Sequence, residues 1–170
     1  MPASEATTTR PALGAVFVGG PFFNLVDPAV GRMSERDQAR FTPLIEYFEN
    51  LGATVYNAHR REAWGAEFLG PLECTERDYN EIAASDLFIA YPGMPVSPGT
   101  HVECGWASAL GKPMILLLEK NEKHTFLVTG LPSIANVEYI WFDDPAEILG
   151  ELDAAVERVM ARTGPSGAAR

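Results

Sequence analysis

One stretch of the sequence, residues 90–107 (AYPGMPVSPGTHVECGWA), combines turn-forming residues, hydroxyl groups and a carboxylate. Ser97, Gly99 and Thr100 stand where a loop is expected to become a helix, and free backbone N–H groups at a helix start attract anions. Glu103 is expected in the first helical turn, where the helix dipole would lower its pKa and keep it ionised. An ionised carboxylate is a nucleophile, so the stretch predicts an anion site beside a nucleophile.

The same residues also have a purely structural interpretation. Ser97 and Gly99 are ordinary turn and cap residues, and Thr100 followed by Glu103 has the spacing of a capping box. On spacing alone this interpretation is the stronger one, because capping boxes are common. The chemistry assigned to Glu103 therefore depends on what else lies near it.

A second carboxylate would strengthen the chemical interpretation. Asp78 lies in a helix expected over residues 71–84, near the end that enters the next strand, and Asp86 stands directly before that strand as an expected strand-entry residue. Two carboxylates in different environments are the usual equipment for cleaving a glycosidic bond. An equally good alternative for Asp78 is an ion pair with Arg77 or Arg61 on the surface.

Other polar and aromatic residues give weaker signals. Phe22 and Phe23 follow the first expected strand and would either stack on a planar base or belong to the core. The run His59-Arg60-Arg61-Glu62 offers polar groups for a base edge or a phosphate, or is a solvated loop. The two cysteines and three histidines show neither C-x-x-C nor H-x-x-x-H spacing, so neither a metal nor a cofactor is predicted.

Five short apolar runs are predicted to be strands that position these groups. Helical spacing indicates helices between them, the first opened by a capping box at Ser34 and Asp37 and closed at Gly52. The strands are expected at residues 15–18, 53–56, 87–91, 113–118 and 137–142, and the other helices at about 71–84, 99–110 and 145–161. This alternation indicates an α/β fold, a flavodoxin- or Rossmann-like five-stranded parallel sheet with helices on both faces.

Two loops are predicted to hold the ligand. In sheets of this kind the ligand binds beyond the carboxyl ends of the strands, where the strand order reverses. This rule selects residues 19–24 after the first strand and residues 92–100 after the third. The Phe22–Phe23 pair and the candidate anion site lie in these loops, so topology and chemistry predict the same place.

The composition limits the organisation and the partners of the chain. With 170 residues, 46% of them hydrophobic, a single domain is expected over residues 13–162, with disordered tails at 1–12 and 163–170. The net charge of −10 argues against a nucleic-acid polymer as partner but allows a small anion. No apolar run approaches the ~20 residues of a membrane helix and no signal pattern is present, so a cytoplasmic protein without membrane contact is expected.

Three motifs combine these residues: Asp78-x7-Asp86, Ser97-x-Gly99-x3-Glu103-x-Gly105-x-Ala107 and Gly111-Lys-Pro. This combination resembles the nucleoside 2-deoxyribosyltransferase superfamily, and the resemblance extends from Phe17 to Phe142. It implies a flavodoxin-like fold and an enzyme whose glutamate, here Glu103, forms a covalent glycosyl-enzyme at C1′ of the sugar. It also implies that Asp78 assists at the base or at the sugar.

Ser97 distinguishes between branches of this family. Transferases that act on free nucleosides carry a carboxylate six residues before the glutamate, where Ser97 stands in this sequence. A carboxylate would repel a phosphate, whereas a hydroxyl at a helix start binds one. The pattern is thus similar to the nucleoside 5′-monophosphate N-hydrolases, which implies a 5′-phosphate bound by Ser97, Gly99 and Thr100.

Further segments resemble the CMP and hydroxymethyl-CMP hydrolases of peptidyl-nucleoside antibiotic pathways. They are Gly19-Gly-Pro-Phe22, Tyr56-Asn-Ala-His-Arg-Arg-Glu-Ala-Trp-Gly65 and Phe126-Leu-Val-Thr-Gly130. Phe17 matches a tyrosine whose hydroxyl lies near the sugar, so its loss would leave room for a ribose 2′-hydroxyl. Phe23 matches an arginine of the deoxynucleotide hydrolases, which leaves the preference for a hydroxymethyl base open. The residues assigned to sugar and base are Phe17, Gly19, Gly20, Phe22, Phe23, His59 and Arg61.

The resulting hypothesis is hydrolysis of the N-glycosidic bond of CMP or hydroxymethyl-CMP to the free base and ribose 5-phosphate. A homodimer is expected, because Thr125 matches a residue that reaches the neighbour's phosphate in the hydrolase dimers. One alternative is a nucleoside deoxyribosyltransferase. Another is a cytokinin-type purine nucleotide phosphoribohydrolase, whose motif is partly imitated by Pro92-Gly93 and by Gly99-Thr100-x2-Glu103. The third alternative is a nucleotide-sensing module that binds without cleaving.

Overall fold

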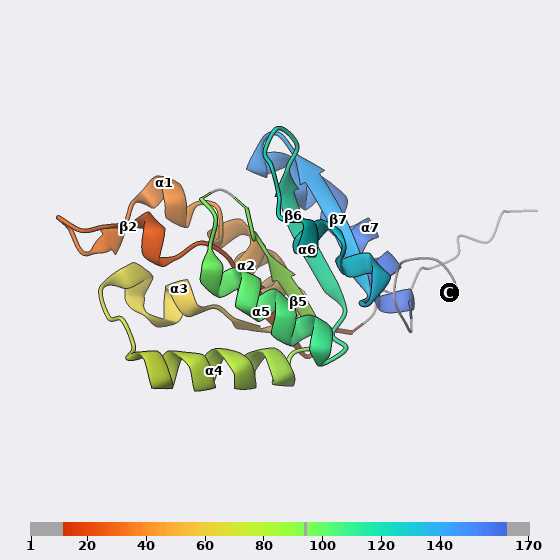
Figure 1. The fold of residues 1–170 in the computed structure, drawn as a ribbon, viewed down its shortest axis with the longest axis horizontal. Helices are drawn as coiled ribbons and strands as arrows, with labels where there is room; N and C mark the ends of the chain where they lie inside the picture. Colours follow the sequence, from red (N-terminus) through yellow and green to blue (C-terminus); the bar gives the residue numbers. More distant parts are fainter. Residues whose placement is uncertain (1–11, 94, 163–170) are drawn as a thin grey trace, which may run out of the picture.

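The computed structural model describes residues 12–93 and 95–162, and a parallel β-sheet runs through its centre (Figure 1). The sheet has the order β4-β1-β5-β6-β7, and all neighbouring strands pair in parallel. The predicted α/β fold is confirmed, and each strand end lies within one residue of its predicted position. The strands are β1 (Ala15–Gly19), β4 (Thr54–Tyr56), β5 (Leu87–Ala90), β6 (Met114–Glu119) and β7 (Val137–Phe142).

The strand order reverses between β1 and β5. From β1 the chain crosses to β4 at one edge, then returns to β5 on the other side of β1 and continues to β6 and β7. Gly19 and Ala90 are paired in register at the carboxyl ends of β1 and β5, so the loops that follow them begin side by side. Sheets of this order bind their ligands at this point.

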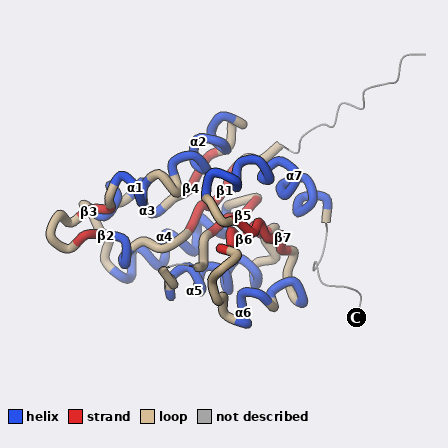
Figure 2. The backbone as a smooth tube through the Cα atoms, turned by 90° about the horizontal axis from the view of Figure 1, so that it is seen from above, coloured by secondary structure: helices blue, strands red, loops and turns tan. Residues whose placement is uncertain are grey.

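Helices cover both faces of the sheet, as predicted. Figure 2 shows α2 and α7 on one side of the strands and α5 and α6 on the opposite side. Each side has its own cluster of buried side chains between helices and sheet. The helices are α2 (Thr42–Asn50) and α7 (Ile148–Ala161) on the first side, and α4 (Pro71–Ala84), α5 (Pro98–Ala109) and α6 (Phe126–Thr129) on the second.

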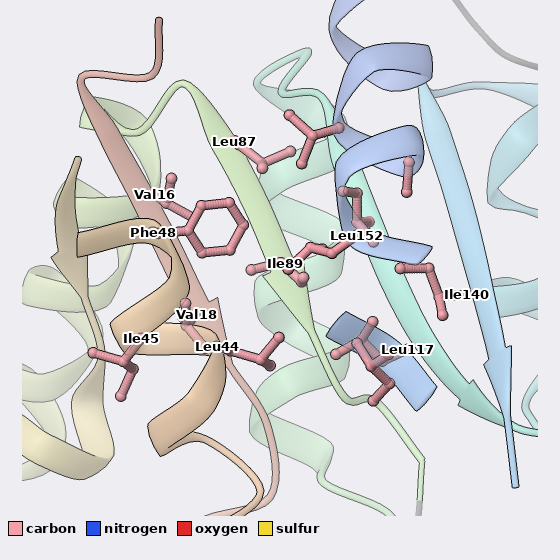
Figure 3. Close-up of a cluster of buried hydrophobic side chains, with 14 of the residues drawn as sticks. Val16, Val18, Leu44, Ile45, Phe48, Leu87, Ile89, Leu117, Ile140 and Leu152 are labelled. Carbon is pink, nitrogen blue, oxygen red and sulfur yellow. The ribbon is translucent and has the colours of Figure 1, made fainter. Parts of the chain in front are cut away.

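Successive side chains of a strand point to opposite faces of the sheet, so each strand contributes side chains to both clusters. Val16 and Val18 of β1 pack with Phe48 of α2 on the first side (Figure 3). Phe17, between them, joins the cluster on the α5 side. The interior strand β6 is buried over Met114–Leu118, as expected for a strand covered on both faces. This packing fixes the strand ends from which the two candidate loops start.

The helix predicted after Ser34 is divided in two. Ser34 Oγ accepts a hydrogen bond from Asp37 N at 3.1 Å, as the capping box predicts, but α1 (Glu35–Gln38) ends after one turn. Pro43 has no N–H to donate to the preceding turn, so one continuous helix would lose a hydrogen bond there. The second part, α2, ends before Gly52, whose φ of +84° is the left-handed conformation typical of a helix stop.

Several elements are too short for sequence periodicity to predict. Each has two to four residues, which is less than the span over which a helical or strand pattern repeats. In the described residues they are the hairpin β2 (Val26–Asp27) and β3 (Arg32–Met33), helix α3 (Ala58–Arg61), and the 3₁₀ turns η1 (Phe23–Leu25), η2 (Ala63–Gly65), η3 (Leu131–Ser133) and η4 (Pro145–Glu147). α6 is equally short and was likewise not predicted.

The predicted tails, 1–12 and 163–170, lie outside the described residues, apart from Ala12. In the part of the chain that the structure describes, the longest helices are α4 and α7, with 14 residues each. None of the helices in this part is long and apolar enough to cross a membrane.

Candidate active site

A cavity of about 630 Å³ lies at the carboxyl ends of β1 and β5, where the topology predicts a ligand. It is lined by the loop after β1, part of α3, residues 68–71, one side of α4 and the start of α5. Of the thirteen predicted site residues, all but Arg61 and Thr125 line this cavity. The eleven that do are Phe17, Gly19, Gly20, Phe22, Phe23, His59, Asp78, Ser97, Gly99, Thr100 and Glu103.

Glu103 lines the cavity from the second turn of α5. Ser97 caps this helix and Pro98 is its first residue, so the predicted place of Glu103 in the first turn is wrong. The effect of the helix dipole falls off within the first turn. Burial and the charge of Asp78 raise the pKa of Glu103 to about 8, against a lowering effect of Arg61, so the predicted low pKa is wrong as well.

The carboxyl group of Glu103 lies against the end of β1. A Cβ atom on Gly19 would be 2.9 Å from Glu103 Oε2 and 3.2 Å from the ring of Phe17. Any side chain larger than that of glycine at this position would therefore displace the Glu103 carboxyl group. Glu103 Oε2 is shielded from solvent and accepts no hydrogen bond from the described residues. A buried acceptor without a donor is costly, and such atoms are found where a ligand supplies the missing partner.

Asp78 lies in the middle of α4, not near its end as predicted. Asp78 Oδ1 accepts a hydrogen bond from Arg61 Nη2 at 2.7 Å, which selects Arg61 over Arg77 as its partner. The pair is partly buried rather than on the surface. Burial raises the pKa of Asp78, and the hydrogen bond and charge of Arg61 oppose that rise. Asp86 accepts a hydrogen bond from Gly14 N at 2.7 Å, at the amino end of the sheet, and is the expected strand-entry residue.

The start of α5 has few free donors. Ser97 Oγ accepts hydrogen bonds from Thr100 N at 3.2 Å and from Thr100 Oγ1 at 2.9 Å, so Ser97 is the cap and the predicted capping box of Thr100 and Glu103 does not form. Pro98 has no N–H. No described residue accepts a hydrogen bond from the Gly99 N–H or from the Ser97 hydroxyl. These two groups are donors available to an anion at the start of α5.

Aromatic rings form much of the cavity wall. Phe17 is buried and stacks on Phe88, with ring centroids 5.6 Å apart. Phe68 contacts Phe22 and Phe23, at centroid distances of 5.0 and 5.7 Å. Phe23 is 79% exposed, so the interpretation of the Phe22–Phe23 pair as core is wrong for this residue. Phe68 was missed because it stands in a segment without helical or strand periodicity.

His59 is a buried, neutral residue beneath the loop that follows β1. Asn57 Nδ2 lies 3.1 Å from His59 Nδ1, so the donor on the opposite side, Nε2–H, donates to the carbonyl of Pro21 at 2.9 Å. Burial lowers the pKa of His59 to about 4. The alternative of a solvated loop at this position is wrong, because Asn57 Oδ1 caps a short helix by accepting from Arg60 N at 2.8 Å.

Arg61 and Thr125 do not line the cavity. Arg61 donates to Asp78, Glu81 and Glu62 at 2.7, 2.5 and 3.1 Å, so protein carboxylates hold a guanidinium that was predicted to contact sugar or base. Thr125 is exposed at the start of α6. Among the described residues, no group of three or more His, Cys, Asp or Glu side chains is arranged to hold a metal ion.

The structure is thus an α/β fold with two carboxylates, Asp78 and Glu103, in one cavity at the switch point of its parallel sheet. The family model for nucleoside 2-deoxyribosyltransferases matches residues 27–159, and the chain belongs to this family. The resemblance inferred from the sequence motifs is thereby confirmed.

Solved structures narrow the comparison. The chain is 49% identical to BlsM, known from a solution structure, over 87% of this chain and 92% of BlsM, with a TM-score of 0.76. It is 41% identical to the CMP N-glycosidase BcmB of Clostridium botulinum, over 82% of this chain and 98% of that one, with a TM-score of 0.65. A 2-deoxyribosyltransferase of Bacillus psychrosaccharolyticus, at 18% identity, 79% and 90% coverage and a TM-score of 0.51, shares the fold. Comparison with curated proteins gave no match.

Proposed function

We propose that this protein is a nucleotide N-glycosidase that hydrolyses CMP or hydroxymethyl-CMP to the free base and ribose 5-phosphate. The observation that carries the proposal is the cavity itself, which brings Glu103 and Asp78 together with the start of α5. The 41% identity to a CMP N-glycosidase over 82% of the chain supports the same activity.

In the proposed reaction Glu103 is the nucleophile. Its carboxylate oxygen attacks C1′ of the sugar as the bond from C1′ to the base nitrogen breaks, and the electron pair leaves with the base, which takes up a proton. Water then attacks C1′ of the glycosyl ester, and the bond to Glu103 breaks with return of its electron pair to the carboxylate. Asp78 is the second carboxylate in the cavity and is proposed to give and take the protons of these steps.

The start of α5 is the proposed site of the 5′-phosphate. The Ser97 hydroxyl and the Gly99 N–H are available donors, and the dipole of a 12-residue helix favours an anion at this end. Thr100 is buried and bonded to Ser97, so its proposed part is to orient the Ser97 hydroxyl rather than to contact the phosphate.

The proposed sugar and base sites follow from what surrounds Glu103. Phe17 has no hydroxyl to bond Glu103 Oε2, and this oxygen can therefore accept a hydrogen bond from a ribose 2′-hydroxyl. Phe22, Phe23 and Phe68 present the ring faces on which a pyrimidine would stack. Cleavage of the ribonucleotide is thus proposed to equal or exceed that of the deoxyribonucleotide.

A panel of substrates tests the proposal directly. The purified protein is incubated with CMP, hydroxymethyl-CMP, dCMP, UMP, AMP and cytidine, and released base is measured by chromatography. We expect base release from CMP or hydroxymethyl-CMP to be fastest and release from cytidine to be slow. Preferred cleavage of AMP would indicate the purine phosphoribohydrolase instead. Base release only with an added acceptor base would indicate a transferase, and binding without release a sensor.

A homodimer is part of the proposal, with Thr125 near the phosphate of the neighbour's site. The residues after Thr125 support an interface, because Phe126 and Leu127 on α6 are 93% and 86% exposed. Large apolar side chains that are this exposed commonly belong to contact surfaces. Light scattering of wild type and of Leu127→Glu tests it: a dimeric mass that becomes monomeric in the variant is expected, and a monomeric wild type would contradict it.

A further inference from the structure

The guanidinium of Arg61 lies between three carboxylates of two helices. Arg61 Nη2 donates to Asp78 of α4 and to Glu62 at the end of α3, and Nη1 donates to Glu81, one turn after Asp78. The Arg61 side chain is 16% exposed, and its three partners are 5% to 18% exposed. Partly buried ion pairs of this kind are screened much less than surface pairs.

Two of the three carboxylates line the cavity. Asp78 and Glu62 are among its lining residues, whereas Glu81 is not. The second oxygen of Glu62 accepts a hydrogen bond from Leu69 N at 3.2 Å, and Leu69 also lines the cavity, beside Phe68. Arg61 therefore connects the candidate proton-transfer residue with the segment that carries part of the aromatic wall.

We propose that Arg61 is a positioning residue for the glycosidase reaction, which holds the Asp78 carboxylate in one orientation beside Glu103 and makes no contact with the substrate. The inference rests on the proposed function and adds a role that acts through Asp78. The planar fork of arginine suits it, because one nitrogen serves Asp78 and Glu62 while the other is held by Glu81. Lysine, a single point charge, would keep the charge without this geometry.

The positive charge of Arg61 also affects the pKa of the two carboxylates, Asp78 and Glu103. Burial raises the pKa of Asp78 and of Glu103, and the positive charge of Arg61 opposes both rises. Besides Arg61, Asp78 raises the pKa of Glu103, and the exposed Arg77 lowers the pKa of Asp78 more weakly than Arg61 does. Removing the Arg61 charge is thus expected to move the pKa of both carboxylates upward.

The neighbouring groups do not replace this charge. Glu81 and Glu62 are themselves acidic and would repel further negative charge once Arg61 is removed. His59 on α3 has its pKa lowered to about 4 by burial and is neutral at physiological pH. Cys104, next to Glu103 on α5, has its pKa raised by burial and by the charge of Glu103, and is neutral too.

The variants for a test are Arg61→Met, which removes charge and hydrogen bonds, and Arg61→Lys, which keeps the charge. Arg60→Met is the matched control, since Arg60 is the adjacent residue and pairs with Glu49 outside the cavity. Two quantities are measured for each: the titration of the Asp78 and Glu103 carboxyl carbons by NMR in the free protein, and kcat/KM for CMP as a function of pH. Thermal unfolding identifies any variant that is not folded.

For Arg61→Met we expect kcat/KM for CMP to fall about ten- to a hundredfold, mostly in kcat, with the loss of a charge-assisted hydrogen bond to Asp78. We also expect the acid limb of its profile of kcat/KM against pH, and the titrations of the Asp78 and Glu103 carboxyl groups, to move to higher pH. Arg61→Lys should keep the titrations near those of wild type and recover part of kcat, and Arg60→Met should match wild type. At a pH above the titration of Glu103, where its ionisation no longer depends on Arg61, adding Arg61→Met to Asp78→Asn should change kcat little, because Arg61 then acts through Asp78.

Unchanged titrations and an unchanged pH profile in folded Arg61→Met would overturn the inference, as would a rise in KM alone, which indicates substrate contact. If Arg61→Met does not fold, Arg61→Lys tests the proposal instead. Because lysine keeps the positive charge, a large upward shift of the Asp78 and Glu103 titrations in this variant would contradict the proposal. The NMR titration needs no substrate, so it is informative even if wild type fails to cleave CMP. A wild type that cleaves neither CMP nor hydroxymethyl-CMP would instead contradict the proposed function.

Discussion

The carboxylates on the two walls of the cavity differ in their hydrogen bonding and in their pKa. On the α5 side, Glu103 presents a shielded oxygen that accepts no hydrogen bond from the described residues, and its pKa is raised to about 8. On the α4 side, Asp78 is bonded to Arg61, which opposes the effect of burial on its pKa. Two identical functional groups in one cavity thus differ in how readily each holds a proton. This order is the reverse of the usual one, in which the nucleophile is ionised and the proton donor has the raised pKa, so Glu103 has to lose its proton before it can attack C1′.

The largest effect on this contrast is expected from Glu103→Gln. The amide keeps the shape of the side chain and cannot attack C1′, so base release from CMP should fall more than ~1,000-fold while nucleotide binding persists. Single-turnover base release and calorimetric binding of CMP measure the two quantities. Glu76→Gln on the exposed side of α4 is the control. Turnover of Glu103→Gln within tenfold of wild type would exclude a covalent role for Glu103.

The next largest effect concerns the phosphate donors at the start of α5. Ser97→Ala removes a hydroxyl donor that is worth about 1.5–3 kcal/mol toward a charged group, or roughly ten- to a hundredfold in kcat/KM for CMP. Ser97→Asp adds repulsion and should be worse for CMP, but should spare any cleavage of cytidine. Kinetics with both substrates separate these effects. If Ser97→Asp leaves CMP cleavage untouched, the phosphate binds elsewhere.

The raised pKa of Glu103 predicts a dependence of stability on pH. Its folded-state pKa is about 8, above the usual 4.5, so folding favours the protonated form. The corresponding stability is fully present below pH 4.5 and is lost as the pH rises through 8. Glu103→Gln escapes this loss and should be more stable than wild type at pH 9, with little difference at pH 4. Melting temperatures across this range provide the measurement, and equal values at pH 9 would show that the carboxyl group is well solvated.

The raised pKa also predicts how the activity depends on pH. A nucleophilic carboxylate must be ionised, so kcat/KM for CMP should increase from pH 6 to about pH 8, the pKa of Glu103 in the free protein. Rate measurements across this range test the increase. A profile that is already flat at pH 6 would mean that Glu103 is ionised there, and that its contrast with Asp78 is smaller than the structure indicates.

The smallest expected effect concerns the sugar. Phe17→Tyr would place a hydroxyl near Glu103, where it can donate to Oε2 in place of a ribose 2′-hydroxyl. The ratio of CMP to dCMP cleavage should then shift toward dCMP by a few-fold to about tenfold, because one contact rarely sets specificity alone. Competition between the two nucleotides in one reaction measures the ratio. A wild type that strongly prefers dCMP would contradict the assignment of Phe17.

Much of the fold and the location of the site could be predicted from the sequence. The apolar runs of β5 and β6 have the length and composition of buried strands, and the rule for switch points then selects the loops after β1 and β5. Seven of the eleven predicted residues that line the cavity lie in these two loops, and the other four, Phe17, His59, Asp78 and Glu103, were assigned from their chemistry and from the family resemblance. Helices and strands of this length are specified by local pattern, and a parallel sheet brings their ends together.

The electrostatic environment of these residues could not be predicted in the same way. The pKa of Glu103 depends on burial by β1 and on Asp78, which stands 25 positions earlier in the chain. The sequence does not choose between Arg61 and Arg77 as the partner of Asp78, because an ion pair between different helices has no characteristic sequence spacing. Phe68 was missed for a similar reason, since it reaches the cavity through contacts with Phe22 and Phe23 and not through a periodic pattern.

The close approach of Gly19 to Glu103 has a consequence for protein engineering. Gly19 lies in β1 without a positive φ, so its backbone conformation is open to any residue. A designer who seeks a more stable strand would replace it with valine, because β-branched residues favour strands. Any such side chain would occupy the space of the Glu103 carboxyl group. At this position, therefore, a substitution chosen to improve the scaffold would displace the proposed nucleophile, and stability screens should hold Gly19 fixed.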